Sequence, residues 1–75
     1  MRRKFPFLDP GEEVGEHVTD NREEVIVVLK GKAALVQDGK ECLLEQGDAY
    51  FIKEGVKHNV KNAANSDLEY VYIVG

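Results

Sequence analysis

The chain has 75 residues, 43% of them hydrophobic and 32% charged, and its ten Lys and Arg against fourteen Asp and Glu give a net charge of −4. We expect no nucleic-acid partner, because phosphate binding needs a clustered positive face and only residues 2–4 carry adjacent basic side chains. We expect no membrane partner either, because no apolar run approaches the roughly 18 residues of a membrane span. Residues 1–75 are predicted to form a single domain.

Cysteine usage and the start of the chain bear on location. Cys42 is the only cysteine, so no intramolecular disulfide can form and a reducing compartment is favoured. The basic start is interrupted by residues 5–10, FPFLDP, before the apolar core of a signal peptide could form. We therefore predict a cytoplasmic protein, in which Cys42 is a packing residue rather than a reactive thiol.

The most hydrophobic segment is predicted to be a strand over residues 24–30. The preceding Asp20-x-x-Glu23 resembles a helix capping box, but residues 25–28 are VIVV, a β-branched run without a 3.6-residue period. Alternation in a strand would point three residues inward and three outward. The inward set is Glu24, Ile26 and Val28, and the outward set is Val25, Val27 and Leu29.

The remaining elements are also predicted to be strands. Asp38-Gly39 is a strong signal for a two-residue hairpin between strands over 33–37 and 40–44. Further strands are expected over 49–53, 57–61 and 68–74, with Gly, Asn and Asp marking the turns. His58 and Val60 should face inward, and Tyr50, Tyr70 and Tyr72 are interpreted as core residues. No helix is predicted, so the fold class is all-β, a sandwich or barrel.

Polar side chains precede the first long strand. His17 and Thr19 are two residues apart, so they share a face if this segment is extended, and a turn at residues 20–21 could return Glu24 toward them. The only other histidine, His58, opens a later strand. Two histidines and one carboxylate with open positions form a site for a divalent transition metal ion, with Fe, Mn, Ni, Zn or Cu as candidates.

Simpler interpretations stay open for each of these residues. The two histidines could be partly exposed side chains at strand ends that make ordinary hydrogen bonds. Glu24 could be solvated and paired with Arg22. Thr19 could be a bystander, or it could hold a water molecule bound to the ion.

The spacing of these residues resembles the two motifs of the cupin superfamily. The first motif reads G, five residues, H-x-H, three or four residues, E, six residues, G, and the second reads G, five residues, P-x-G, two residues, H, three residues, N. Eight of the ten defined positions match, and residues 32–46 separate the motifs. The matching residues are Gly11, His17, Glu24 and Gly31, then Gly47, Gly55, His58 and Asn62.

The resemblance implies a cupin jelly-roll barrel of two packed antiparallel sheets, with about eight or nine short strands. It also implies a metal site made of His17, Glu24 and His58. Two positions depart from the pattern. Lys53 replaces the proline of the second motif, which affects turn rigidity, and Thr19 replaces the second histidine of H-x-H, which the resemblance makes a fourth metal ligand.

Members of the superfamily include oxygenases, isomerases, decarboxylases, and sugar-binding and regulatory domains, so the fold leaves the function open. One hypothesis is a metal-dependent oxygenase or isomerase that binds a small-molecule substrate at the ion. The alternative is a non-catalytic small-ligand-binding or regulatory module with a degenerate metal site. Whether the protein is an enzyme is left undecided. A homodimer is expected in either case, because Val25, Val27 and Leu29 need a cover that so short a chain lacks.

Overall fold

The computed structural model describes residues 2–4 and 7–75, which form eight β-strands and no helix. No helix of this part of the chain could therefore cross a membrane. The strands are β1 (Arg2–Lys4), β2 (Phe7–Leu8), β3 (Glu24–Lys30), β4 (Lys32–Gln37), β5 (Lys40–Glu45), β6 (Ala49–Ile52), β7 (His58–Lys61) and β8 (Leu68–Val74).

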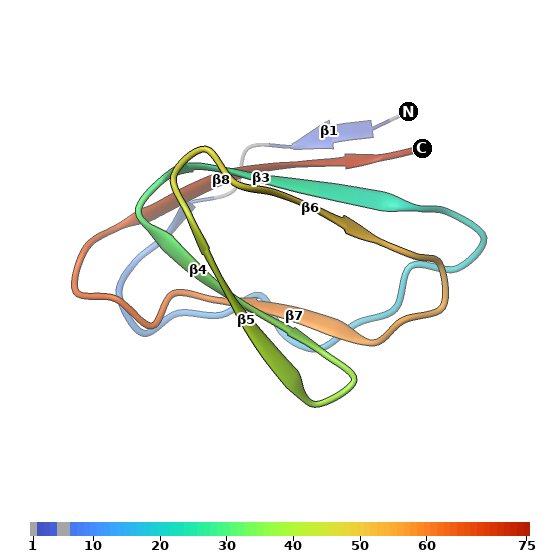
Figure 1. Cartoon of the computed structure of the whole chain (residues 1–75), viewed down its shortest axis with the longest axis horizontal. Coiled ribbons are helices and arrows are strands. Elements are labelled where there is room, and N and C mark those ends of the chain that lie inside the picture. The colour runs from blue at the N-terminus through green and yellow to red at the C-terminus, as the bar shows by residue number, and fades with distance from the viewer. Residues whose placement is uncertain (1, 5–6) are drawn as a thin grey trace.

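The strands form two antiparallel sheets that face each other (Figure 1). The upper sheet in that view has five strands in the order β1-β8-β3-β6, with β2 also paired to β8. The lower sheet has three strands in the order β5-β4-β7. This arrangement confirms the prediction of an all-β jelly roll made of two packed sheets.

An irregular segment, residues 11–17, extends the lower sheet along β7. Backbone N–H groups of Val14 and His17 donate to the carbonyl oxygens of Val60 and His58, each at 2.9 Å. Isolated bridge pairs join Glu13 to Lys61 and His17 to His58. The segment that carries His17 is therefore fixed beside the strand that carries His58.

Six strands were predicted from the sequence, and all six are confirmed with ends that agree within one residue. β1 and β2 were not predicted, because runs of three and two residues show no recognisable alternation. Both depend on pairing with the distant β8, which aligns Arg3 with Ile73 and Phe7 with Glu69. Only the tertiary arrangement creates these two strands.

Left-handed backbone conformations set two of the turns. Asp38 and Gly39 have φ values of 47° and 79°, as a type I′ hairpin requires, so the predicted hairpin is confirmed. Gly31 has φ 87°, and a Cβ atom there would collide with the carbonyl oxygen of Asp67. Only glycine fits the turn between β3 and β4 without displacing the loop that leads into β8.

The core lies between the two sheets, as the alternation predicted. The buried cluster is Ile26, Val28, Ala33, Leu35, Leu44, Ile52, Val60, Leu68 and Tyr70, and Cys42, Tyr50 and Tyr72 pack against it. On the outer side of the upper sheet, Val25 and Val27 are half-buried. Leu29 and Phe51 are 45% and 49% exposed. The fold thus leaves apolar side chains without full cover on the face that was predicted to need a partner.

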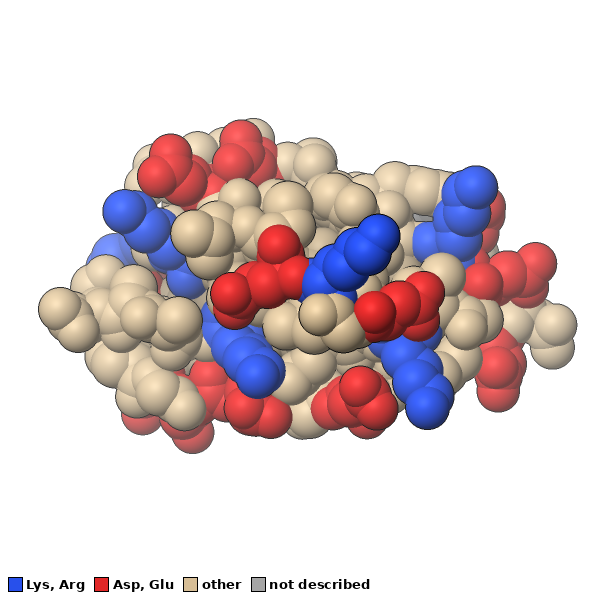
Figure 2. Space-filling view, turned by 60° about the horizontal axis from the view of Figure 1, so that its bottom comes forward, with Lys and Arg blue, Asp and Glu red and all other residues tan. Residues whose placement is uncertain are grey.

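Charges of both signs alternate over the face shown in Figure 2, which turns the bottom of the molecule toward the viewer. Lys32 lies 3.8 Å from Glu45, and Lys61 lies 4.0 Å from Glu13. Ion pairs that are this exposed and this long contribute little to stability.

Candidate metal centre

His17, Glu24 and His58 come together at one end of the barrel. Glu24 is the first residue of β3 in the upper sheet, and His58 is the first residue of β7 in the lower sheet. His17 lies on the irregular segment beside β7. One ligand atom from each residue can be chosen so that all lie within 4.8 Å of one another. The two sheets therefore meet at three side chains of types that can bind a metal ion.

Backbone hydrogen bonds return the chain so that these residues meet. His17 and His58 exchange two N–H···O bonds of 2.9 Å, which aligns their side chains on neighbouring segments. Gly55 donates to the carbonyl oxygen of Thr19 at 3.1 Å, which ties the turn after His17 to the turn before His58. Asn21 has φ 58°, a conformation that asparagine tolerates, and this reverses the chain into β3.

A buried asparagine holds the His17 segment in place. Asn59 is 6% exposed, although it follows His58 on a strand and would be expected to face solvent. Its Oδ1 accepts a hydrogen bond from the backbone N–H of Gly15 at 2.8 Å, and its Nδ2 donates to Glu13 at 3.1 Å. Sequence reasoning missed this residue. The only available signal was its position, directly after a histidine that opens a strand.

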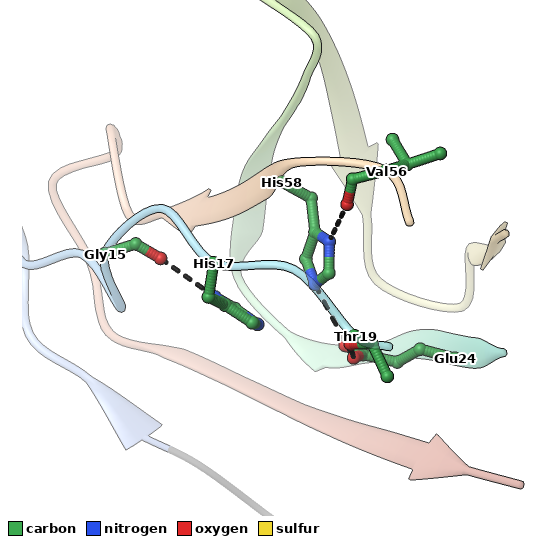
Figure 3. Close-up of polar contacts among 6 residues, drawn as sticks. All are labelled: Gly15, His17, Thr19, Glu24, Val56 and His58. Atoms are coloured by element: carbon green, nitrogen blue, oxygen red, sulfur yellow. Dashed lines mark hydrogen bonds and ion pairs between the residues drawn. The ribbon is translucent and has the colours of Figure 1, made fainter. Parts of the chain in front are cut away.

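Hydrogen bonds to carbonyl oxygens determine the tautomer of both histidines. Nδ1 of His17 lies 2.9 Å from the carbonyl oxygen of Gly15, and Nδ1 of His58 lies 2.8 Å from that of Val56 (Figure 3). A carbonyl oxygen can only accept, so the proton of each neutral ring is on Nδ1. Each Nε2 then carries a free lone pair, the arrangement found in metal-binding histidines.

One of these lone pairs has no partner. His58 is 1% exposed, and its buried Nε2 makes no hydrogen bond to any residue that the structure describes. The nearest acidic atom is Oε1 of Glu24, at 3.5 Å, and with the ring proton on Nδ1 neither atom has a hydrogen to donate to the other. Buried polar atoms almost always have partners, so this lone pair beside a carboxylate is the unusual feature of the cluster.

Glu24 and Thr19 complete the cluster. Glu24 is 5% exposed, which excludes the interpretation that it is solvated at a strand entrance. Thr19 is half-buried, and its hydroxyl donates to Oε1 of Glu24 at 3.2 Å (Figure 3). The interpretation of two exposed histidines is also wrong for His58, whereas His17 is exposed. The cluster therefore opens to solvent on the His17 side.

The electrostatic influence of the site reaches Tyr70. This residue is 2% exposed, and its burial holds the pKa of its phenol well above the ordinary value. The negative charge of Glu24 raises this pKa further, and Tyr72 makes a smaller contribution in the same direction. Tyr70 is a core residue, as predicted, whose phenol stays neutral over the ordinary pH range.

Two open hollows lie elsewhere on the surface. One, of about 800 Å³, lies over β4 and the 63–66 loop. The other, of about 390 Å³, lies between β5 and β6 and includes Cys42, Tyr50 and Lys53. Neither is lined by a residue of the triad. The second includes Val56, whose carbonyl oxygen orients His58.

Comparison with known proteins identifies relatives of this arrangement. A family model described as "Cupin domain" matches residues 7–74. A search of curated protein sequences found no significant match. The match to the family model covers the triad and nearly all of the described structure.

Several solved structures share the fold. A predicted oxalate decarboxylase from Thermotoga maritima is 29% identical, with a TM-score of 0.91 over 96% of this chain and 63% of its own. A double-stranded β-helix protein from Klebsiella pneumoniae is 26% identical, with a TM-score of 0.92 over 97% of this chain and 64% of its own. A Cupin 2 conserved barrel domain protein from Salinispora arenicola is 25% identical, with a TM-score of 0.88 over 96% and 60%. This chain therefore spans less than two thirds of the length of these three proteins.

Proposed function

The chain belongs to the cupin family, and on that premise we propose that His17, Glu24 and His58 bind a divalent transition metal ion that in turn binds a small molecule. The observation that carries this proposal is the unpartnered Nε2 of His58, a buried lone pair that faces the carboxylate of Glu24. A bound cation would satisfy both atoms at once. A proton is the only other positive charge small enough to do so.

The donor set fits a transition metal ion. Two imidazole nitrogens and one carboxylate oxygen are ligands that Fe, Mn, Ni, Zn and Cu accept, and three protein ligands leave positions for water or substrate. When bound, such an ion supplies Lewis acidity or activation of oxygen. The two carbonyl oxygens that accept from Nδ1 fix the rings, as outer partners commonly do in metal sites.

The side chains around the site favour a small substrate. His17 is exposed, so a ligand can approach from solvent on that side. Glu24 and His58 are buried, so the other ligands are reached only from that side. One structural relative is named as a predicted oxalate decarboxylase, which makes small carboxylates the first substrates to test. Oxygenase and isomerase reactions on small oxygen-bearing molecules are the other candidates.

Metal analysis tests the proposal directly. Protein purified without added metal should contain a first-row transition metal ion, and calorimetry on the metal-free protein should give a 1:1 site. Imidazole nitrogens bind the ion only when they carry no proton, so affinity should fall as the solution is made more acidic. Anomalous scattering from crystals should place the ion within bonding distance of His17, Glu24 and His58. Metal-free protein that binds none of the five metals would contradict the proposal.

A second candidate is a metal-free module that binds a small ligand. The observation that favours it is the 3.5 Å separation of Nε2 and Oε1, which a protonated His58 could use as an ion pair. Nitrogen-15 NMR at neutral pH distinguishes the two. If Nε2 of His58 still carries a proton after metal is added, the metal-free module is supported. If added metal displaces that proton, the metal site is supported.

The outer face of the upper sheet supports a homodimer. Val25 is paired with Phe51 on β6 and with Ile73 on β8, and all three side chains lie on this face. A second copy of the chain would cover them. Light scattering at micromolar concentration should give twice the mass of the chain, and Phe51→Asp should shift it to a monomer. A monomer before substitution would contradict this. The cytoplasmic location stays a prediction.

A further inference from the structure

Thr19 occupies the position where the resemblance to cupins calls for a fourth metal ligand, and its contacts suggest a different role. The carbonyl oxygen of Thr19 accepts from Gly55 at 3.1 Å, which fixes its backbone. Its hydroxyl donates to Oε1 of Glu24 at 3.2 Å, which fixes its side chain. Thr19 is thus held at both ends, between the turn before His58 and the carboxylate of the triad.

The donor and acceptor roles in this contact are unambiguous. A hydroxyl has one hydrogen to donate, and a carboxylate oxygen accepts. The single hydrogen of Thr19 is therefore used by Glu24. The same Oε1 lies 3.5 Å from the unpartnered Nε2 of His58. Thr19 holds the one carboxylate oxygen that faces the free lone pair.

Glutamate needs this restraint more than the two histidines do. Each imidazole is oriented by a hydrogen bond from Nδ1 to a carbonyl oxygen of its own segment. Glu24 has three side-chain torsions, and among the described residues the hydroxyl of Thr19 is its one hydrogen-bond donor. Ordering a long side chain costs conformational entropy, which a ligand already held in place does not lose again on binding.

We propose that Thr19 is a positioning residue, which orients Glu24 for metal binding and is not itself a ligand. The proposal rests on the metal function argued above. It follows that the ion keeps one more position for water or substrate than it would with a fourth protein ligand. Outer partners of metal ligands typically change affinity by about 10–100-fold when they are removed, so the effect is measurable.

The test compares substitutions that separate the hydroxyl from the shape of the side chain. Thr19→Val keeps the shape and removes the hydroxyl, and we expect affinity for Mn²⁺ and Zn²⁺, measured by calorimetry, to fall about 10–100-fold. Thr19→Ser keeps the hydroxyl and should stay within about threefold of the original protein. Val18→Thr is the control, because it adds a hydroxyl at the neighbouring residue, which is 39% exposed. It should leave the metal affinity unchanged. If Thr19→Val does not fold, the affinity of Thr19→Ala is compared with that of Thr19→Ser instead.

A metal-free readout keeps the two proposals distinguishable. In crystals of metal-free Thr19→Val, the carboxylate of Glu24 should move away from Nε2 of His58, and in Thr19→Ser it should stay. An unmoved carboxylate, or undiminished affinity in Thr19→Val, would overturn the positioning role. Failure of the unsubstituted protein to bind Mn²⁺ or Zn²⁺ would instead remove the metal function, while the position of Glu24 in these crystals would still decide the role of Thr19.

Discussion

Two buried polar residues, His58 and Asn62, lie at the two ends of β7, and they differ in how many of their polar atoms have hydrogen-bond partners. Asn62 directly follows β7, is 1% exposed, and makes three side-chain hydrogen bonds, to Leu8, Ala64 and Ser66. His58 opens β7, is equally buried, and has one nitrogen bonded and the other without a partner. Burial of a polar residue alone therefore does not indicate a ligand site. The proposed metal site rests on the atom of His58 that has no partner.

Removing Asn62 should have the largest effect, and the effect should be on stability. Asn62→Ala leaves two carbonyl oxygens and the N–H of Ala64 without their partner, so we expect the free energy of unfolding to fall by about 3 kcal/mol. Urea denaturation measures this change. Asn65→Ala, an exposed residue of the same loop, is the control and should change it by less than about 0.5 kcal/mol. Equal losses in both variants would contradict a structural role specific to Asn62.

Removing His58 should chiefly affect metal binding. His58→Ala deletes a proposed ligand, so affinity should fall by more than about 100-fold, beyond the range typical of outer partners. Calorimetry on metal-free protein measures it. Val60→Ala, the next inward residue of β7, removes buried volume without removing a ligand and should retain the affinity. Undiminished binding in His58→Ala would exclude this residue from the site.

Adding an imidazole at position 19 should change metal binding at the mouth of the barrel. Thr19→His restores the histidine of the cupin motif, and the ion should bind at least about tenfold more tightly than in Thr19→Val, which lacks both the hydroxyl and the imidazole. Val18→His, on the neighbouring residue, should leave affinity unchanged. Affinity no tighter than that of Thr19→Val would mean that residue 19 does not face the ion.

Tyr70 gives the smallest predicted effect, as a dependence of stability on pH. Its pKa is raised in the folded protein, chiefly by burial, so above about pH 10 the unfolded chain loses a proton that the folded protein keeps. The free energy of unfolding should therefore fall as pH rises, by about 1 kcal/mol between pH 10 and 11. Tyr70→Phe should remove this slope, and Tyr72→Phe is the control. A slope that persists in Tyr70→Phe would assign it to other groups.

Much of the fold could be predicted because its signals are local. The β-branched run of residues 25–28 and the Asp38-Gly39 pair determine a strand and a hairpin through steric preferences of a few consecutive residues. The same alternation placed Glu24 and Ile26 on the inner face. The spacing of His17, Glu24 and His58 also indicated that these residues meet, through resemblance to a family pattern rather than through any local preference.

Three features became visible only in the tertiary structure. They are the strands β1 and β2, the hydrogen bonds by which Asn59 holds the His17 segment, and the contact between Thr19 and Glu24. Each depends on partners that are distant in the chain or on the path of a turn, which no short sequence window contains. The sequence by itself determined which side chains could bind an ion. Whether a lone pair among them is left without a partner depends on three-dimensional packing, because hydrogen bonds form between whichever groups the closed barrel brings within about 3 Å.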